Sequence, residues 1–165
     1  MVKADWTIYE EDYWAITSVL KELLKNSNSQ SVLLIDKTGQ MIGSVGLEPD
    51  FDLMSFASLC AADFEANSQL ARLIGETDFS TLYHQGADES MYLARIASNI
   101  ILVVLFNKRT TLGLVRLRVK KAVEGLDTIL NRLFEKLEYE NEDLKEFDEE
   151  FTQELTKEID ALFSD

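Results

Sequence analysis

The fold is decided by seven consecutive apolar residues, Ile100-Ile101-Leu102-Val103-Val104-Leu105-Phe106, most of which are β-branched or aromatic. A strand with one exposed face would alternate polar and apolar residues, so this run predicts a strand that is covered on both faces. Polar residues interrupt the run at positions 107–111, where a threonine can cap a helix. From Leu112 to Leu133 apolar residues recur every three or four positions. This period predicts an amphipathic helix that packs back over the sheet.

The remaining segments supply four further strands and two further helices. In chain order, the predicted elements are a helix at 7–25, strands at 31–35 and 41–45, a helix at 53–74, and strands at 79–84 and 91–97. Asp52 can cap the second helix and Gly75 can end it. This order predicts an α+β fold, with a five-stranded, largely antiparallel sheet and helices on both faces.

The second predicted helix has two different faces. Its core face is apolar and consists of Leu53, Phe56, Ala57, Cys60, Phe64, Ala71 and Ile74. The opposite face is rich in small residues and has few long charged side chains: Ser58, Ala61, Ala62, Glu65, Ser68, Gln69 and Arg72. Small side chains let another backbone come close, so we interpret this face as a protein-contact surface. The other interpretation is high helix propensity alone.

Charge is unevenly distributed along the chain. The formal net charge is −14, and residues 135–165 carry 13 acidic and 3 basic side chains. This acidity argues against binding to nucleic acid. One run without acids carries six cations: Lys108, Arg109, Arg116, Arg118, Lys120 and Lys121. These cations are either a solvated helix start or a docking patch for an acidic protein surface, with the protein's own tail as one candidate.

The composition changes after Leu137, which predicts a domain over residues 1–137 and an acidic C-terminal tail over residues 138–165, with a linker at 138–143. Apolar residues recur in the tail at steps of three and four: Leu144, Phe147, Phe151, Leu155, Ile159 and Leu162. This spacing is typical of an amphipathic helix that docks on another surface. A continuation of the preceding helix is the alternative.

No active site is recognisable. His84 and Cys60 are the only residues of their types, and Cys60 falls on the expected core face, where thiols are usually inert. Metal clusters of Cys and His are therefore excluded, no glycine-rich phosphate loop is present, and we expect no cofactor. The longest apolar run is far shorter than the roughly 20 residues needed to cross a bilayer. The single cysteine fits a reducing compartment, so we expect a cytoplasmic protein without membrane insertion.

Several stretches resemble the Roadblock/dynein light chain family. Two look like its first hairpin and the end of its second helix: Ser31-Val32-Leu33-Leu34-Ile35-Asp36-Lys37-Thr38-Gly39-Gln40 and Leu70-Ala71-Arg72-Leu73-Ile74-Gly75-Glu76. The strand-to-helix junction at Asn107–Arg118 and the ending Glu158–Asp165 are similar to those of bacterial gliding-motility members. The order and spacing of these stretches carry the resemblance, more than any one of them.

The resemblance implies a Roadblock-like fold, with one long helix on one sheet face and two helices on the other. It also implies a homodimer in which the sheets join edge to edge and the second helices lie side by side. By the same resemblance, such a dimer would bind a small Ras-like GTPase, here of the MglA type in bacterial polarity and motility. It would activate GTP hydrolysis by repositioning the GTPase's own catalytic residues. The chain would then be a regulator without an active site of its own.

The same resemblance implies site residues. The GTPase would meet Ala61, Ala62, Glu65, Ser68, Gln69 and Arg72. A secondary GTPase contact would use the tail residues Phe147, Phe151, Leu155, Ile159, Leu162 and Phe163. Arg72, Arg95 and Arg109 are candidate arginine fingers, and nothing in the sequence selects one of them. Two other functions stay open: a structural adaptor that leaves hydrolysis unchanged, and a small-molecule sensor with a pocket inside the domain.

Overall fold

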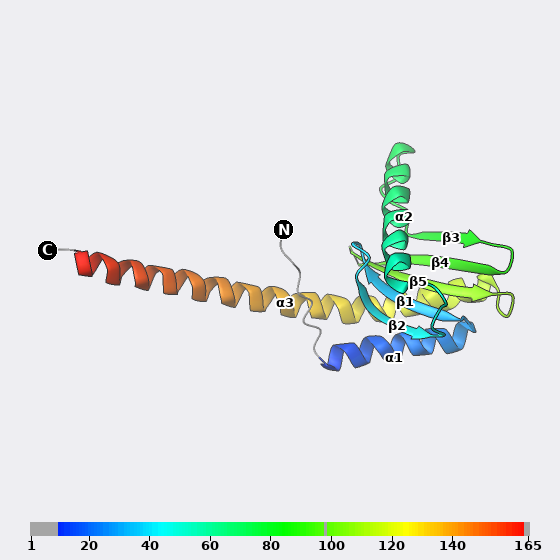
Figure 1. Ribbon diagram of the computed structural model, residues 1–165, viewed down its shortest axis with the longest axis horizontal. Coiled ribbons are helices and arrows are strands. Elements are labelled where there is room, and N and C mark those ends of the chain that lie inside the picture. Colours follow the sequence, from blue (N-terminus) through cyan, green and yellow to red (C-terminus); the bar gives the residue numbers. More distant parts are fainter. Residues whose placement is uncertain (1–9, 98, 164–165) are drawn as a thin grey trace. The chain divides into compact units, whose positions relative to one another are not determined.

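The computed structural model describes residues 10–97 and 99–163; for residues 140–150, 158 and 160–163 it describes the backbone alone. The chain divides into two units, Met1–Leu130 and Asn131–Asp165. The elements in chain order are α1 (Glu10–Ser27), β1 (Ser31–Asp36), β2 (Met41–Gly46), α2 (Leu53–Leu73), β3 (Thr81–Gln85), β4 (Glu89–Ile96), β5 (Ile100–Asn107) and α3 (Leu112–Phe163) (Figure 1). The predicted order of helices and strands is confirmed, with small shifts at their ends.

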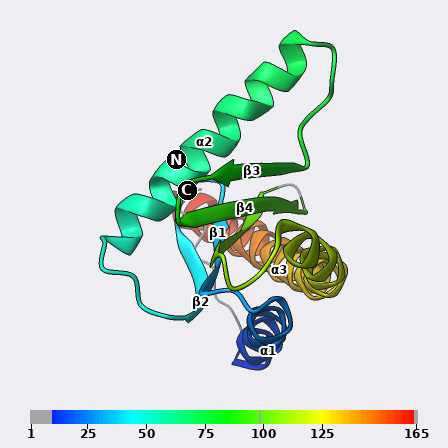
Figure 2. The ribbon, with the colours of Figure 1, turned by 90° about the vertical axis from the view of Figure 1, so that its right-hand side faces the viewer.

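All five strands belong to one antiparallel sheet, in the order β2-β1-β5-β4-β3. The inner strands β1 and β5 are buried along most of their length. α2 covers one face of the sheet, and α1 and the first part of α3 cover the other (Figure 2). The structure therefore confirms the predicted α+β class and the antiparallel sheet. It also confirms that one helix covers one face of the sheet and two helices cover the other.

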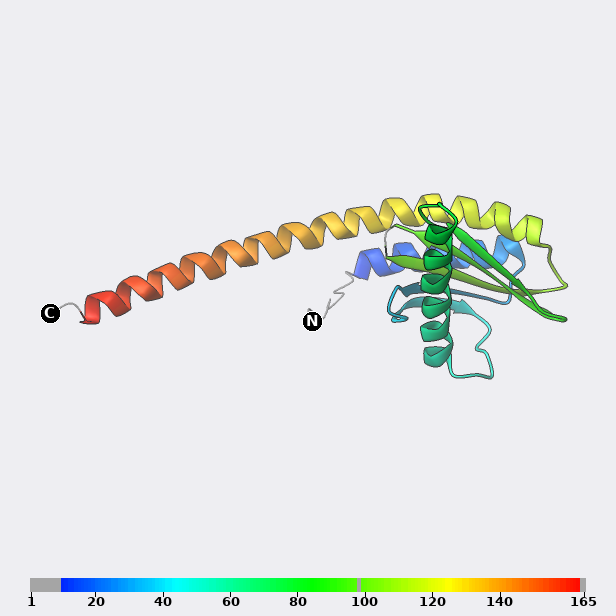
Figure 3. The ribbon, with the colours of Figure 1, turned by 90° about the horizontal axis from the view of Figure 1, so that it is seen from above.

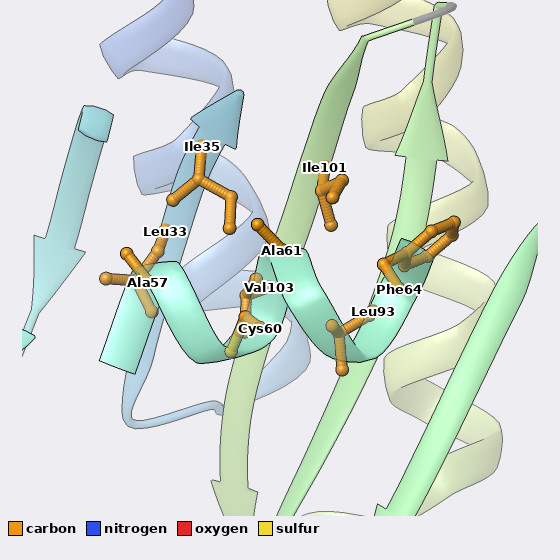
Figure 4. Packing of buried hydrophobic residues seen from close by; sticks show 9 residues of the cluster. All are labelled: Leu33, Ile35, Ala57, Cys60, Ala61, Phe64, Leu93, Ile101 and Val103. Carbon is orange, nitrogen blue, oxygen red and sulfur yellow. The ribbon is translucent and has the colours of Figure 1, made fainter. Parts of the chain in front are cut away.

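Alternation along the central strands divides their side chains between two cores. On the α2 side, Leu33, Ile35, Leu93, Ile101 and Val103 pack against Ala57, Cys60, Ala61 and Phe64 (Figure 4). The intervening positions Val32, Leu34 and Leu102 are also fully buried. Because neighbouring strand residues point to opposite faces, these side chains belong to the core under α1 and α3. The seven-residue run is apolar throughout because both of its faces are covered.

The helices on the two faces run in different directions. α1 and the first part of α3 follow the strands roughly, whereas α2 crosses them steeply (Figure 3). Asp52 caps α2, since its side chain accepts a hydrogen bond from the backbone nitrogen of Met54 at 3.2 Å. Gly75, with φ +87°, follows the end of the helix as predicted. The C-terminal turns of α2 extend past the edge strand β3 (Figure 1, Figure 2).

α3 is helical through residues 138–143, so the linker predicted there is wrong. From Leu126 onward the chain contains no glycine or proline and is rich in Glu, Lys and Leu, which favour helix. The alternative, a continuation of the preceding helix, is what the structure has. A functional division between residues 1–137 and 138–165 stays a prediction.

Two glycines with the same φ angle provide a matched test of the contact between α2 and the first hairpin. Gly39 and Gly75 both have φ +87°, but a Cβ at Gly39 would lie 2.6 Å from the Cα of Ser58, whereas one at Gly75 would meet nothing within 4 Å. We expect Gly75→Ala to lower the free energy of unfolding by about 1 kcal/mol through backbone strain. Gly39→Ala should cost roughly 2 kcal/mol more, because hairpin and helix must separate. Urea denaturation measures both costs, and equal values would contradict the contact.

Candidate functional site

The outer face of α2 carries a row of exposed apolar side chains, which we call the apolar stripe: Leu59, Ala62, Ala66, Leu70 and Leu73. The three leucines keep 68%, 54% and 81% of their surface exposed. Steps of three and four residues place all five on one side of the helix. A single exposed leucine is ordinary, whereas a contiguous apolar row marks a surface for contact with another protein.

A second row, which we call the polar stripe, lies beside the first on α2: Ser58, Glu65, Gln69 and Arg72, all exposed. The Nε2 of Gln69 donates to Oε1 of Glu65 over 2.8 Å. The stripe presents an amide, a carboxylate and a guanidinium within two helical turns. These groups can make hydrogen bonds and ion pairs with a partner protein.

Four of the six residues predicted to meet a GTPase lie on this outer face: Ala62, Glu65, Gln69 and Arg72. The other two do not. Ala61 is 4% exposed and lies in the core between α2 and the sheet (Figure 4), and Ser68 is 2% exposed. Their predicted exposure is wrong because α2 buries a wider part of its circumference than its large apolar residues indicate. Small side chains such as Ala61 and Ser68 occupy the margin of this buried part.

Ser68 is buried within a polar network under α2. Its Oγ lies 2.8 Å from Oδ1 of Asp78 and accepts a hydrogen bond from Nη2 of Arg95 at 2.9 Å. Arg95 also pairs with Asp78, and its guanidinium lies 5.1 Å from the centre of the Phe64 ring. Among the candidate arginine fingers, Arg95 is therefore engaged inside the domain, whereas Arg72 is exposed on the polar stripe.

Ile74 also differs from expectation. α2 ends at Leu73, and Ile74 is the C-cap residue with φ −95° and ψ 6°. Its side chain is 71% exposed, so its assignment to the core is wrong. The chain leaves the helical path just before the position at which the apolar period would have turned this side chain inward.

An open groove of about 710 Å³, which we call the α2 groove, lies on the same face of the sheet. Its apolar walls include Phe51 and Phe56 around the start of α2, Met91 from β4 and Leu105 from β5. No local pattern predicted this groove, because its walls come from segments that are far apart in the chain.

The sheet edge next to this face is formed by β3, which pairs only with β4 in the described sheet. Its outer backbone groups are available to another strand. The Nε2 of His84 in β3 lies 2.7 Å from Oδ2 of Asp63 in α2, which links the strand to the helix. The C-terminal turns of α2 extend beyond the sheet edge that β3 forms (Figure 2).

The described residues offer little reactive chemistry. Cys60 is 2% exposed, and burial together with the nearby charge of Asp63 raises the pKa of its thiol to about 11. The thiol is therefore protonated and inert at neutral pH. In the part of the chain that the structure describes, no three His, Cys, Asp or Glu side chains are placed to hold a metal ion. No helix in those residues has an apolar stretch that could cross a membrane.

The second unit contributes a short apolar row on α3. Phe151, Leu155 and Ile159 keep 54%, 43% and 50% of their surface exposed, and their four-residue spacing places them on one side of the helix. The side chains of Phe147, Leu162 and Phe163, predicted for the same contact, lie outside the described ones.

The comparisons agree with this architecture. The family described as Roadblock/LC7 domain matches residues 16–106, from within α1 to β5. The chain is similar to Myxococcus xanthus MglB (44% identity, 77% of this chain and 96% of that one, TM-score 0.73). It is also similar to the gliding protein MglB from Thermus thermophilus (30% identity, 79% and 99%, TM-score 0.74). A Roadblock/LC7 domain from Streptomyces avermitilis shares the fold at 15% identity, 71% and 95% coverage and TM-score 0.60. No curated protein matches the chain.

Two serines on α2 test the buried network. We expect Ser68→Ala to lower the free energy of unfolding by about 1–2 kcal/mol, because Asp78 and Arg95 lose a buried partner. Ser58→Ala is the matched control, since the Oγ of Ser58 is exposed and donates only to the carbonyl of Met54 at 3.0 Å. Its cost should stay below about 0.5 kcal/mol. Urea denaturation of both variants decides the point, and a cost for Ser68→Ala as small as the control's would count against the network.

Proposed function

The chain belongs to the Roadblock/LC7 family and is an MglB-like protein, and we propose that it forms a homodimer that activates GTP hydrolysis by a small Ras-like GTPase of the MglA type. The observation that carries the proposal is the pair of stripes on α2. The apolar stripe suits self-association, and the polar stripe suits a second protein. We further propose that the protein acts in the cytoplasm, in bacterial polarity or motility.

Dimerisation is supported by the incomplete cover that one α2 gives to the sheet. Because α2 crosses the strands steeply, its width of about 10 Å covers only part of their length, which is roughly 20–26 Å for β1 and β5. The α2 groove is part of the surface left open. A second α2, antiparallel to the first, would carry its overhanging residues Leu70 and Leu73 to this groove.

The same arrangement brings the two apolar stripes together. Ala62 and Ala66 at the centre of the stripe allow two helix backbones to come close. The β3 strands of the two copies would pair edge to edge and continue the sheet. Two-fold symmetry repeats every contact, so a modest patch on one chain contributes twice to the interface.

The polar stripes of the two helices would then lie next to each other on the outer surface of the dimer, where a GTPase can bind. The proposed contacts on each copy are Glu65, Gln69 and Arg72, with Ala62 at the border between the two stripes. Activation requires no catalytic group from the dimer. Contact with the switch segments would hold the GTPase's own glutamine and arginine where they stabilise the charge of the transition state.

We assign a secondary GTPase contact to the C-terminal part of α3. Its support is the exposed row of Phe151, Leu155 and Ile159, set in an acidic segment that suits a basic partner surface. Phe147, Leu162 and Phe163 belong to the same proposed contact. The alternative function, an adaptor that binds a GTPase or a motor complex without activating it, would use the same surfaces and leave GTP turnover unchanged.

One substitution tests the dimer. Ala66→Arg places a charge in the middle of the apolar stripe and should raise the dissociation constant of the dimer by at least about a hundredfold, because the charge has no partner when buried. Ala87→Arg, at an exposed position in the turn after β3, is the matched control and should leave the dimer intact. Sedimentation velocity distinguishes the two. A dimeric Ala66→Arg variant would place the interface elsewhere.

A second pair of variants tests the GTPase contact. The double variant Glu65→Arg/Gln69→Arg should reduce stimulation of GTP hydrolysis at least about tenfold, because it changes the net charge of the polar stripe from zero to +3. Glu11→Arg/Gln40→Arg makes the same exchanges at exposed positions in α1 and the first hairpin and should stimulate normally. Single-turnover hydrolysis by an MglA-type GTPase is the measurement. Equal stimulation by both variants would remove the polar stripe from the contact.

A further inference from the structure

The face of the sheet opposite α2 also carries an open groove. It has a volume of about 610 Å³ and runs along α3 beside β3 and β4. We call it the α3 groove and define it by Tyr92, Ala94, Arg116, Leu117, Lys120 and Val123. All of these residues belong to the first unit. The groove is separate from the α2 stripes and independent of the proposed GTPase contact.

The groove exists because two helices do not cover five strands. α1 lies against β1 and β2, and α3 follows beside it with Val119 buried on the sheet. Packed helices lie about 8–10 Å apart, which leaves the outer strands on the β3 side open. The open strip lies beside α3, where a third helix of this layer would lie. Its width fits one further helix.

The floor and wall of the groove are apolar. Tyr92 and Ala94 of β4 form the floor, and Leu117 and Val123 of α3 form the wall. Leu117 is 61% exposed although it is a large aliphatic side chain. A partner that covers it would remove apolar surface from water.

The rim of the groove is basic in a chain whose net charge is −14. Arg116 and Lys120 are exposed, one helical turn apart, and make no ion pair among the described residues. Other cations of the same run are engaged: Lys108 pairs with Asp88 at 3.3 Å, and Lys121 with Glu22 at 3.1 Å. Glu124, at the far end of the groove, is the one acidic residue among those that line it. Its charge is therefore the one that offsets the two rim cations.

We propose that the α3 groove docks an acidic amphipathic helix of a partner protein. The docked helix lies beside α3 as a third helix of the layer. Its apolar side chains contact Leu117 and Val123, and carboxylates spaced by three or four residues pair with Arg116 and Lys120. Charge complementarity selects an acidic partner, and the helix-wide gap selects a helix over an extended peptide.

The test uses the full chain and a labelled synthetic peptide of about 14 residues, long enough to follow the groove, with leucines on one helical face and glutamates on the other. A scrambled peptide of the same composition keeps the charge and loses the apolar face. We expect the amphipathic peptide to bind, and the scrambled one to bind at least about tenfold more weakly. Fluorescence anisotropy gives the dissociation constants.

Variants of the chain then locate the site. Arg116→Glu/Lys120→Glu should raise the dissociation constant about tenfold, and Leu117→Ser should raise it severalfold. Lys108→Glu/Arg109→Glu changes the net charge by the same amount but lies outside the groove. This variant should change the dissociation constant less than about twofold. Circular dichroism checks that each variant is folded.

Three outcomes would overturn the proposal: no binding of the amphipathic peptide, equal binding of the scrambled peptide, or equal losses in the two double variants. The last two would reduce the site to general attraction between opposite charges.

Discussion

Burial of β1 and β5 on both faces is the constraint on which this structure depends. An apolar strand in the middle of a sheet requires a layer on each side, so α2 must cover one face and α1 with α3 the other. Neither layer covers the sheet completely: α2 crosses the strands and covers only part of their length, and α1 with α3 leaves the β3 side of the other face open. The α2 groove and the α3 groove are both consequences of this incomplete cover.

The functional proposal follows from how α2 meets this constraint. α2 crosses the strands steeply and overhangs one edge (Figure 1, Figure 3). One of its sides packs on the core, and the proposal assigns the other two to another copy and to a different protein. The apolar and polar stripes divide the last two tasks. In the proposed complex the dimer regulates a GTPase without supplying a reactive group, because its contribution is a rigid and symmetric surface.

Most of the fold could be predicted from local patterns. The run at 100–106, the Asp52 cap and the Gly75 terminator each act within a few residues, so the sequence displays them directly. The error at Ser68 has a non-local cause, unlike those at Ile74 and at the predicted linker. Ser68 is buried because Asp78 and Arg95, from other parts of the chain, satisfy its hydroxyl, and no helical period shows this. The two grooves escaped prediction for the same reason.

The central claim is that two copies of this chain act together on one GTPase. The most direct measurement is GTP turnover by an MglA-type GTPase, titrated with this protein at GTPase concentrations well above the dissociation constant. We predict a rise of at least about tenfold, with a break at two chains per GTPase. Binding without faster turnover, or a break at one chain per GTPase, would contradict the claim.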